Sequence, residues 1–250
     1  MFSIKGYKPK LTSALLSKIA IADSVESAIG MVFQVWSNND TSTVVSFINA
    51  HAMNLAHKSP HFYQVLLSSD VLLRDGIGMK ILMKSASMPV GFNANGTDFI
   101  PNILKVVKGK NLAIFVTSSE VVALCKAKLE DDGHKINIFD HGFHEDEYYL
   151  KKIINTNVEV IILGMGMPRQ ELLANKLKNN LNQNLLIING GAILDFMSGS
   201  VSRAPLIFRK TGCEWLYRLL QEPRRLWKRY ILGNVCFLLG TIQHLCTMKK

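Results

Sequence analysis

Several apolar stretches of this chain end in turns that carry Asp, Asn and Gly, the residue types that bind and activate small ligands. The first such turn is Asp75-Gly76-Ile77-Gly78. A carboxylate at the end of a strand faces the crevice in which ligands bind, and the glycines of this turn let the backbone approach a ligand closely. Asp75 could equally be only the N-cap of the following helix. The motif alone leaves both roles open.

A second turn has the sequence GMGMPRQE over residues 164–171. Pro168 suits the first turn of a helix. The free N–H groups and the positive dipole end of that helix favour a phosphate group. An ordinary strand-to-helix turn with a solvated Arg169 and Gln170 fits the same sequence.

Two further turns are Asn189-Gly190-Gly191-Ala192 and Asn95-Gly96-Thr97-Asp98. The second of them opens a predicted helix, with Thr97 or Asp98 as its cap. Each of these turns, taken alone, is more typical of local structure than of ligand binding.

Several well-known sites are missing from the sequence. It contains no GxxxxGK[ST] phosphate loop, and no third glycine completes a dinucleotide fingerprint, which disfavours an NAD-type oxidoreductase. A GxSxG nucleophile elbow and a DxD triplet are also absent. His57 and His61 share a helical face but lack an acidic third ligand, so we expect no metal site.

The elements that must position these turns alternate between short apolar runs and helical stretches. Near-continuous apolar runs are typical of strands covered on both faces. The alternation predicts a mostly parallel, doubly wound, Rossmann-like α/β sheet, whose ligands bind beyond the carboxyl ends of the strands. The expected strands are Thr43–Asn49, Val71–Asp75, Asn111–Thr117, Ile136–Asp140, Glu159–Met165 and Asn184–Asn189. We interpret residues 1–42 as an N-terminal lead-in segment of mixed secondary structure that precedes the first expected strand.

The positive charge of the chain is concentrated in its C-terminal fifth. The formal net charge is +10, and ten Lys or Arg residues lie from Arg203 onward, opposed only by Glu214 and Glu222. This segment is helical, basic and aromatic, with a break expected at Pro223. We therefore expect a catalytic domain over residues 1–200 and a helical appendage over residues 201–250.

A basic and aromatic helical segment of this kind can lie in a membrane interface, attracted to anionic lipids. A core-packing helix with a solvated basic face is an alternative, and no motif supports nucleic-acid binding. Residues 230–248 carry no Lys, Arg, Asp or Glu, which is barely long enough to span a bilayer. Gly233, Asn234 and Gly240 weaken spanning, so interfacial contact or protein packing is favoured.

Taken in order, six strings resemble the WecG/TagA/CpsF family of bacterial glycosyltransferases. They are FINAHAMNLA (47–56), DVLLRDGIGM (70–79), NGTDF (95–99), LGMGMPRQE (163–171), NGGAILDFMSGSVSRAP (189–205) and GCEWLYRLLQEPRRLWKRY (212–230). The resemblance runs from about residue 24 to residue 235.

This resemblance implies a compact Rossmann-like domain with a C-terminal appendage. It implies transfer of a sugar, often N-acetylmannosamine or its uronic acid, from a UDP donor to an undecaprenyl-diphosphate-linked saccharide, with inversion at the anomeric carbon. The family is regarded as independent of metals, and no cofactor is implied. The protein is expected on the inner face of the plasma membrane, as a peripheral cytoplasmic protein and a possible homo-oligomer. Four cysteines without a CxxC pair are typical of reduced, cytoplasmic thiols.

The resemblance also implies roles for individual residues. The catalytic base falls on Asp75, the glutamine near the nucleotide on Gln170, and the diphosphate-binding arginines on Arg218, Arg225 and either Lys228 or Arg229. The residues expected to bind the nucleotide sugar are Asn49, Gly76, Gly78, Gly96, Thr97, Asp98, Gly164, Gly166, Pro168, Gln170, Glu171, Gly190 and Gly191. Those expected at the acceptor diphosphate or the membrane are Arg203, Arg218, Arg224, Arg225, Lys228 and Arg229.

One position departs from the family pattern. Some members carry Thr two residues before the motif Asn49, where this chain has Phe47 with Ser46 beside it. The competing hypothesis is a membrane-surface nucleotide-binding scaffold without enzymatic activity, which would not need Asp75.

Overall fold

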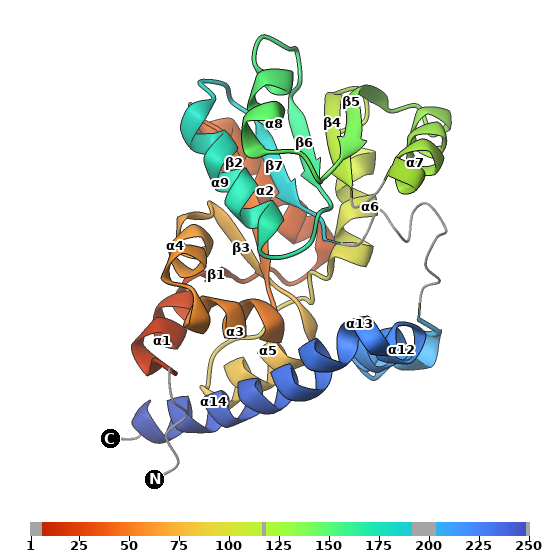
Figure 1. The fold of residues 1–250 in the computed structure, drawn as a ribbon. Helices are drawn as coiled ribbons and strands as arrows, with labels where there is room; N and C mark the ends of the chain where they lie inside the picture. The colour runs from red at the N-terminus through yellow and green to blue at the C-terminus, as the bar shows by residue number, and fades with distance from the viewer. Residues whose placement is uncertain (1–6, 117–118, 192–203, 249–250) are drawn as a thin grey trace.

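The computed structural model describes residues 7–116, 119–191 and 204–248. Its centre is one parallel sheet of seven strands in the order β1-β3-β2-β7-β6-β4-β5 (Figure 1). The strands are β1 Ile19–Ala20, β2 Thr43–Ile48, β3 Val71–Arg74, β4 Asn111–Val116, β5 Lys135–His141, β6 Val160–Leu163 and β7 Leu186–Asn189. The predicted α/β fold is confirmed, and all six predicted strands are present with slightly different ends.

The register of the central strands brings their carboxyl ends to one edge of the sheet. Ile48 of β2 lies opposite Arg74 of β3, and Leu163 of β6 lies opposite Asn189 of β7. The chain therefore leaves these four strands at neighbouring points. Every residue of β2, β3, β6 and β7 is buried, which explains why their sequences are predominantly apolar.

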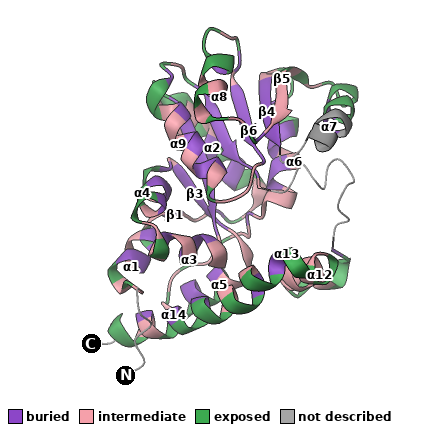
Figure 2. Cartoon of the chain, viewed as in Figure 1, coloured by how far each residue is buried: buried purple, intermediate pink, exposed green. Residues whose placement is uncertain are grey.

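Helices cover both faces of the sheet. One face packs against α2 (Val25–Asn38), α6 (Gly96–Val106) and α7 (Ser119–Asp131). The other face packs against the remaining helices of the α/β unit: α1 Pro9–Lys18, α3 Ala50–Lys58, α4 Pro60–Ser68, α5 Gly76–Ser85, α8 Asp146–Ile153 and α9 Arg169–Asn180. Figure 2 shows the buried strands between these two layers. Two helices and the short edge strand β1 thus occupy most of the predicted lead-in.

The C-terminal segment is helical throughout its described part, as predicted. Its elements are α11 Leu206–Lys210, α12 Glu214–Gln221, α13 Pro223–Trp227, a π-helical turn η1 Lys228–Leu232 and α14 Gly233–Met248. The break at Pro223 is confirmed, because α12 ends at Gln221 and Pro223 begins the next helix. In Figure 1 the segment runs beneath the α/β unit and ends beside α1.

The last helix, α14, joins the C-terminal segment to the core of the α/β unit. It packs against α3, α5 and α1. Phe237 is 3% exposed and belongs to the same apolar cluster as Met53 and Met79, while Thr241 and His244 are also buried. The boundary near residue 200 remains a prediction, and α14 lies in one packed unit with the residues before that boundary.

Candidate active site

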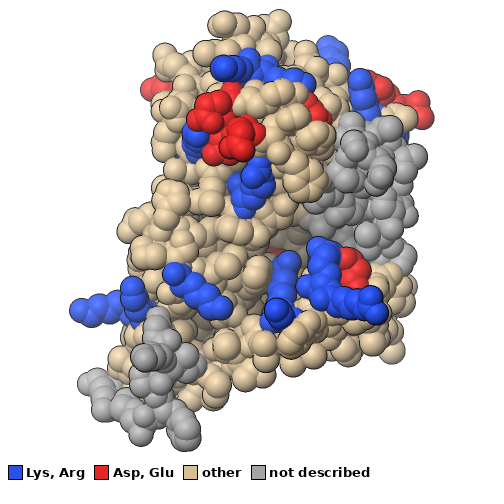
Figure 3. Space-filling model, in the orientation of Figure 1, with Lys and Arg blue, Asp and Glu red and all other residues tan. Residues whose placement is uncertain are grey.

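A pocket of about 680 Å³ opens at the carboxyl ends of β2, β3, β6 and β7. The first residues after these strands form its floor, and side chains from α12 to α14 form its opposite wall. Figure 3 shows the molecule hollowed between the sheet and the basic C-terminal segment. Thirteen predicted site residues line this one pocket: Asn49, Asp75, Gly76, Gly78, Gly96, Thr97, Gly166, Gln170, Gly190, Gly191, Arg218, Arg225 and Arg229.

The carboxylate of Asp75 is available for chemistry. Asp75 occupies the N-cap position of α5, yet its side chain makes no capping hydrogen bond. Its Oδ2 instead accepts a hydrogen bond of 3.1 Å from Nδ2 of Asn49. Asp75 therefore occupies the cap position without capping α5 through its side chain.

Burial raises the pKa of Asp75 above its ordinary value, because a charged carboxylate is poorly solvated there. The hydrogen bond from Asn49 and the positive charges of Arg218, Arg229 and Arg74 oppose this effect without cancelling it. A carboxylate with a raised pKa is a stronger base than an exposed one, once it is ionised.

Asn49 links Asp75 to helix α3. Its Oδ1 accepts a hydrogen bond of 3.0 Å from the N–H of Ala52 and so caps that helix. Its amide nitrogen remains directed at Asp75. One Asn side chain thus begins α3 and orients the carboxylate.

A buried arginine that the sequence analysis missed supports the turn after β3. Arg74 is 4% exposed and donates to the backbone carbonyls of Val90 and Gly91 at 3.0 and 3.2 Å. It also donates to Oδ1 of Asn93, which accepts a further bond of 2.8 Å from the N–H of Gly76. Gly76 has φ +83°, a conformation that favours glycine. The only feature of the sequence that could have indicated this role is a charged residue at the end of an apolar strand.

Gln170 holds the two glycine turns together. Its Oε1 accepts hydrogen bonds from the N–H groups of Gly166 (3.1 Å) and Gly191 (3.0 Å). Its Nε2 donates to Oε1 of Glu171 at 2.7 Å. The N–H groups of Gly166 and Gly191 are therefore bonded to Gln170.

Glu171 lies behind the pocket instead of in its lining. It is fully buried, its Oε2 has no hydrogen-bond partner among the described residues, and burial raises its pKa to about 7. Its contact with Gln170 fixes the orientation of that amide. Gly164, Pro168 and Asp98 likewise lie outside the lining.

Two glycines of the predicted site lie so close to other protein atoms that a larger side chain would crowd them. This holds independently of any role in binding a ligand. A Cβ on Gly78 would lie 3.2 Å from both Ala50 and the ring of Phe237 in α14. A Cβ on Gly96 would lie 3.0 Å from the carbonyl oxygen of Gly190.

The helix after Gly96 also differs from the prediction at its cap. The cap of α6 is Asn95, which accepts from the N–H of Asp98, and neither Thr97 nor Asp98 has this role. Asn95 also donates to Oδ2 of Asp98 at 2.9 Å. This bond explains why Asp98 is turned toward its own helix.

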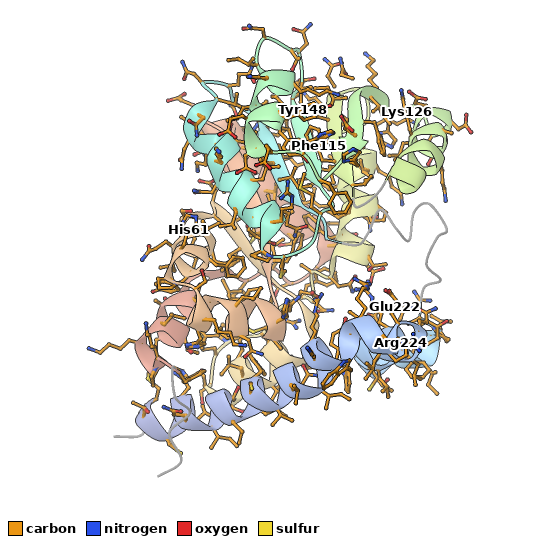
Figure 4. The ribbon with its side chains drawn as sticks, viewed as in Figure 1. His61, Phe115, Lys126, Tyr148, Glu222 and Arg224 are labelled. Carbon is orange, nitrogen blue, oxygen red and sulfur yellow. The ribbon has the colours of Figure 1, made fainter. Side chains whose placement is uncertain are left out.

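The predicted basic residues of the C-terminal segment divide into two groups. Arg218, Arg225 and Arg229 line the pocket, joined by Arg209, which the sequence analysis did not single out. Between Lys228 and Arg229, the structure therefore places Arg229 at the pocket. Arg224 and Lys228 are exposed on the C-terminal segment outside its lining; Arg224 is labelled in Figure 4. Arg203 lies outside the described residues.

Sequence reasoning also missed several uncharged pocket side chains, among them His51, Trp215 and Tyr230. Burial, and then the positive charges of Arg229 and Lys58, together lower the pKa of His51 to about 4. His51 is therefore neutral at pH 7. No pattern in the sequence could place residues 215 and 230 opposite residue 51.

One cluster with metal-ligand chemistry lies at the end of β5, apart from the pocket. The ligand atoms of Asp140, His141 and His144 lie within 4.8 Å of one another. The Asp140 carboxylate already accepts bonds from Tyr148 (2.5 Å) and Lys152 (2.8 Å). The two imidazole rings stack at 4.1 Å with a 20° interplanar angle, so their lone pairs cannot converge on one ion. His57, considered above, instead bonds to Thr12 at 3.0 Å.

Taken together, the doubly wound sheet and its pocket define an α/β protein in which arginines and the carboxylate of Asp75 line one pocket. The sequence profile of the family described as "Glycosyl transferase WecG/TagA/CpsF family" matches residues 15–250, and the chain belongs to this family.

Three relatives share the name N-acetylglucosaminyldiphosphoundecaprenol N-acetyl-beta-D-mannosaminyltransferase. The protein of Bacillus spizizenii (strain ATCC 23059 / NRRL B-14472 / W23) is 29% identical over 181 residues, which cover 70% of each chain. That of Bacillus subtilis (strain 168) is 26% identical over 216 residues, covering 84% of each. That of Staphylococcus aureus (strain MW2) is 26% identical over 200 residues, covering 78% of this chain and 77% of the relative.

Proposed function

We propose that this protein is an inverting glycosyltransferase. Its donor is a UDP-sugar, carrying N-acetylmannosamine or a related N-acetylhexosamine or uronic acid, and its acceptor is an undecaprenyl-diphosphate-linked saccharide of cell-surface polysaccharide synthesis. The names of the three relatives support the sugar and the acceptor. The observation that carries the reaction type is Asp75, a half-buried carboxylate that makes no capping bond and lines the same pocket as the arginines.

In this reaction Asp75 takes the proton of the acceptor hydroxyl as that oxygen attacks the anomeric carbon of the donor. The new carbon–oxygen bond forms on one side of the sugar, and the bond to UDP breaks on the opposite side. UDP leaves with the bonding electron pair and becomes more negative. Asp75 must be ionised at the start, so the rate rises with pH through its raised pKa.

The leaving diphosphate needs positive charge at the place where its own charge grows. Arg218 and Arg229 offer guanidinium groups that can bond to phosphate oxygens in pairs, and Arg225, which also lines the pocket, donates from Nε and Nη2 to the carboxylate of Glu222. We infer that these groups take the part that a divalent cation plays in many sugar-nucleotide enzymes, so that transfer is independent of metal.

The exposed face of the C-terminal segment supports a membrane-surface location. The described residues include one helix, Pro223–Met248, that is long and apolar enough to cross a membrane by length and composition. Because Phe237 and His244 on one side of this helix are buried in the protein, we infer that the helix lies along the membrane. Its other side exposes large apolar side chains, including Trp227, Ile231, Leu238 and Ile242.

The basic side chains outside the pocket add to this contact. Arg224 and Lys228 are exposed near Trp227, and each basic residue near an anionic surface contributes about 1 kcal/mol. We therefore place the protein on the cytoplasmic face of the plasma membrane. Sedimentation with anionic vesicles tests this location. Replacing Leu238 and Ile242 by Asp should release the protein from the vesicles. If the protein with both substitutions sediments with the vesicles as the wild type does, the proposed location is contradicted.

The function is tested by measuring UDP release from a panel of UDP-sugars, with and without an undecaprenyl-diphosphate-linked N-acetylglucosamine acceptor. We expect release that depends on the acceptor, with UDP-N-acetylmannosamine as the best donor. A protein that binds UDP but releases none with any donor would be a scaffold, and the proposal would fail.

A further inference from the structure

One side chain of α3 forms a hydrogen bond with the start of α14. Nδ2 of Asn54, in the middle of α3, donates a hydrogen bond of 2.7 Å to the backbone carbonyl of Gly233. The two residues are 179 positions apart in the sequence. Asn54 falls within the string 47–56 that resembles the family, yet it does not line the pocket, so the proposed function gives it no role.

Gly233 closes the π-helical turn η1. Its N–H donates to the carbonyl of Lys228, five residues earlier, whereas an α-helix would bond to the residue four earlier. Short π-helical turns are rare in proteins as a whole, but those that occur are often found at functional sites. This turn carries Arg229 and Tyr230, and both of these side chains line the pocket. The turn therefore decides the direction in which Arg229 points.

The other end of α3 holds the catalytic carboxylate. Asn49 caps the helix and donates to Asp75, as described above. From Asn49 to Asn54 the helix rises by roughly 7.5 Å, at about 1.5 Å per residue. A single rigid element thus contacts Asp75 at its first residue and the π-helical turn five residues later.

We propose that Asn54 is a positioning residue, which fixes the place of Arg229 relative to Asp75 by holding the π-helical turn against α3. The inference rests on the proposed function, because it gives Arg229 and Asp75 parts in one reaction. Asn54 itself touches neither substrate. It acts through the carbonyl of Gly233.

The docking of α14 does not depend on this bond alone. Phe237 is buried between Ala50 and Gly78, and Gly240 faces the ring of Tyr7. These contacts hold the body of the helix, which lies after Gly233. The bond from Asn54 acts at the first residue of α14, directly after the π-helical turn that carries Arg229 and Tyr230.

Two titratable groups report where Arg229 lies. The pKa of Asp75 is raised by burial and lowered by Asn49 from α3, Arg218 from α12, Arg229 from η1 and Arg74 from β3. The pKa of His51, in the first turn of α3, is lowered by burial, then by Arg229, then by Lys58. If Arg229 moves away, both pKa values must rise.

The test compares Asn54→Leu, which keeps the size of the side chain and removes its amide, with a matched control, Asn184→Leu. Asn184 also donates from Nδ2 to a distant backbone carbonyl, that of Asn39 at 2.8 Å, but away from the pocket. Two quantities are measured: the pKa of His51, by NMR on the protein without substrate, and the pH dependence of kcat and KM.

For Asn54→Leu we expect the pKa of His51 to rise from about 4 toward its ordinary value. The acidic limb of the kcat profile should move to higher pH, and kcat should fall by about 10- to 100-fold, as misplacement of a charged group implies. KM for the donor should change much less. Asn184→Leu should leave all these quantities as in the wild type.

A double-mutant cycle with Arg229→Met decides the mechanism, because residues acting through one another are not additive. Once Arg229 is gone, Asn54→Leu should cost little more activity. Full additivity, or an unchanged His51 pKa in Asn54→Leu, would overturn the proposal. If Asn54→Leu does not fold, Asn54→Ser, which is too short to reach Gly233, replaces it with the same expectations.

The two proposals fail in different ways. A wild-type protein that transfers no sugar contradicts the proposed function. The NMR titration of His51 needs no substrate, so its result still decides whether Asn54 places Arg229.

Discussion

Replacing Asp75 by Asn should have opposite effects on activity and on stability. The variant keeps the size of the side chain and can still accept the hydrogen bond from Asn49, but it cannot take a proton. It also removes a charge from a site where burial raises the pKa of the carboxyl group above its ordinary value of 3.8. The protein should therefore become less active and, at neutral pH, more stable.

The activity change follows from the role of a general base. Losing a positioned base lowers the rate by about 10²- to 10⁴-fold. The surrounding arginines and glycine turns remain, so binding of UDP should change little. This separation identifies Asp75 with the chemical step instead of with binding.

The stability change follows from the sign of the pKa shift. Because the folded protein binds this proton more tightly than the unfolded chain, the stability that Asp75 contributes is fully present below the unfolded pKa. It is lost as the pH rises through the folded pKa. Each unit by which the pKa is raised corresponds to about 1.4 kcal/mol of free energy of unfolding. Asn does not ionise, so the advantage of Asp75→Asn should grow with pH and then level off above the folded pKa.

Urea unfolding at pH 4 and pH 8, together with UDP release, measures both effects. Asp70→Asn serves as a control, because Asp70 bonds to Lys178 at 2.6 Å and to the N–H of Val44 at 2.7 Å. It should lose stability and keep its activity. The reasoning is refuted if Asp75→Asn retains more than a tenth of wild-type turnover, or gains no stability relative to wild type between the two pH values.

Three further predictions concern the same pocket. Transfer should continue in EDTA, and a loss of turnover restored by Mg²⁺ or Mn²⁺ would contradict the role given to the arginines. Asn49→Ser and Asn49→Ala should both move the acidic limb of the pH–rate profile upward, because both lose the bond that lowers the pKa of Asp75. Only the Ala variant should also lose about 1 kcal/mol in urea unfolding, because Ser still caps α3 by accepting from Ala52. Gly78→Ala should lower the free energy of unfolding by about 1–3 kcal/mol, because the new Cβ would lie 3.2 Å from Phe237. An unchanged unfolding midpoint would show that α14 moves to accommodate the Cβ without strain.

The sequence was sufficient for the sheet because its central strands are buried on both faces. Runs such as Val160–Leu163 and Leu186–Asn189 have few alternatives once they are flanked by turns and helices. The strand β1 was not predicted, since Ile19–Ala20 has only two residues and no pattern that distinguishes it from a helix end. The predicted ends of β2, β3 and β6 extend too far, because Asn49, Asp75 and Met165 lie after these strands and line the pocket.

The same physics explains which parts of the site could be anticipated. Parallel strands end at one edge, so Asp75 and the turns after β6 and β7 had to meet once the fold was known. The contacts of Gly78 and Gln170 could not be inferred, because each includes a partner from another element of the fold. Gly78 faces Phe237, and the amide of Gln170 bridges the N–H groups of Gly166 and Gly191. A residue type shows which bonds are available, but only the packed structure shows which of them are used.

The balance of charge in the pocket is the strongest link between the C-terminal segment and the chemistry. Four arginines line the pocket, against the two lining carboxylates Asp75 and Glu214 and the carboxylate of Glu222, which pairs with Arg225, so one positive charge is in excess. His51 adds none at neutral pH, because burial and Arg229 keep its pKa at about 4. All four arginines come from residues 209–229, whereas Asp75 comes from the sheet. The sheet alone would therefore offer a base without the charge that stabilises a leaving diphosphate, and the C-terminal segment alone would bind anions without a base. The transfer reaction requires both, and the packing of α14 on α3 is what brings them into one pocket.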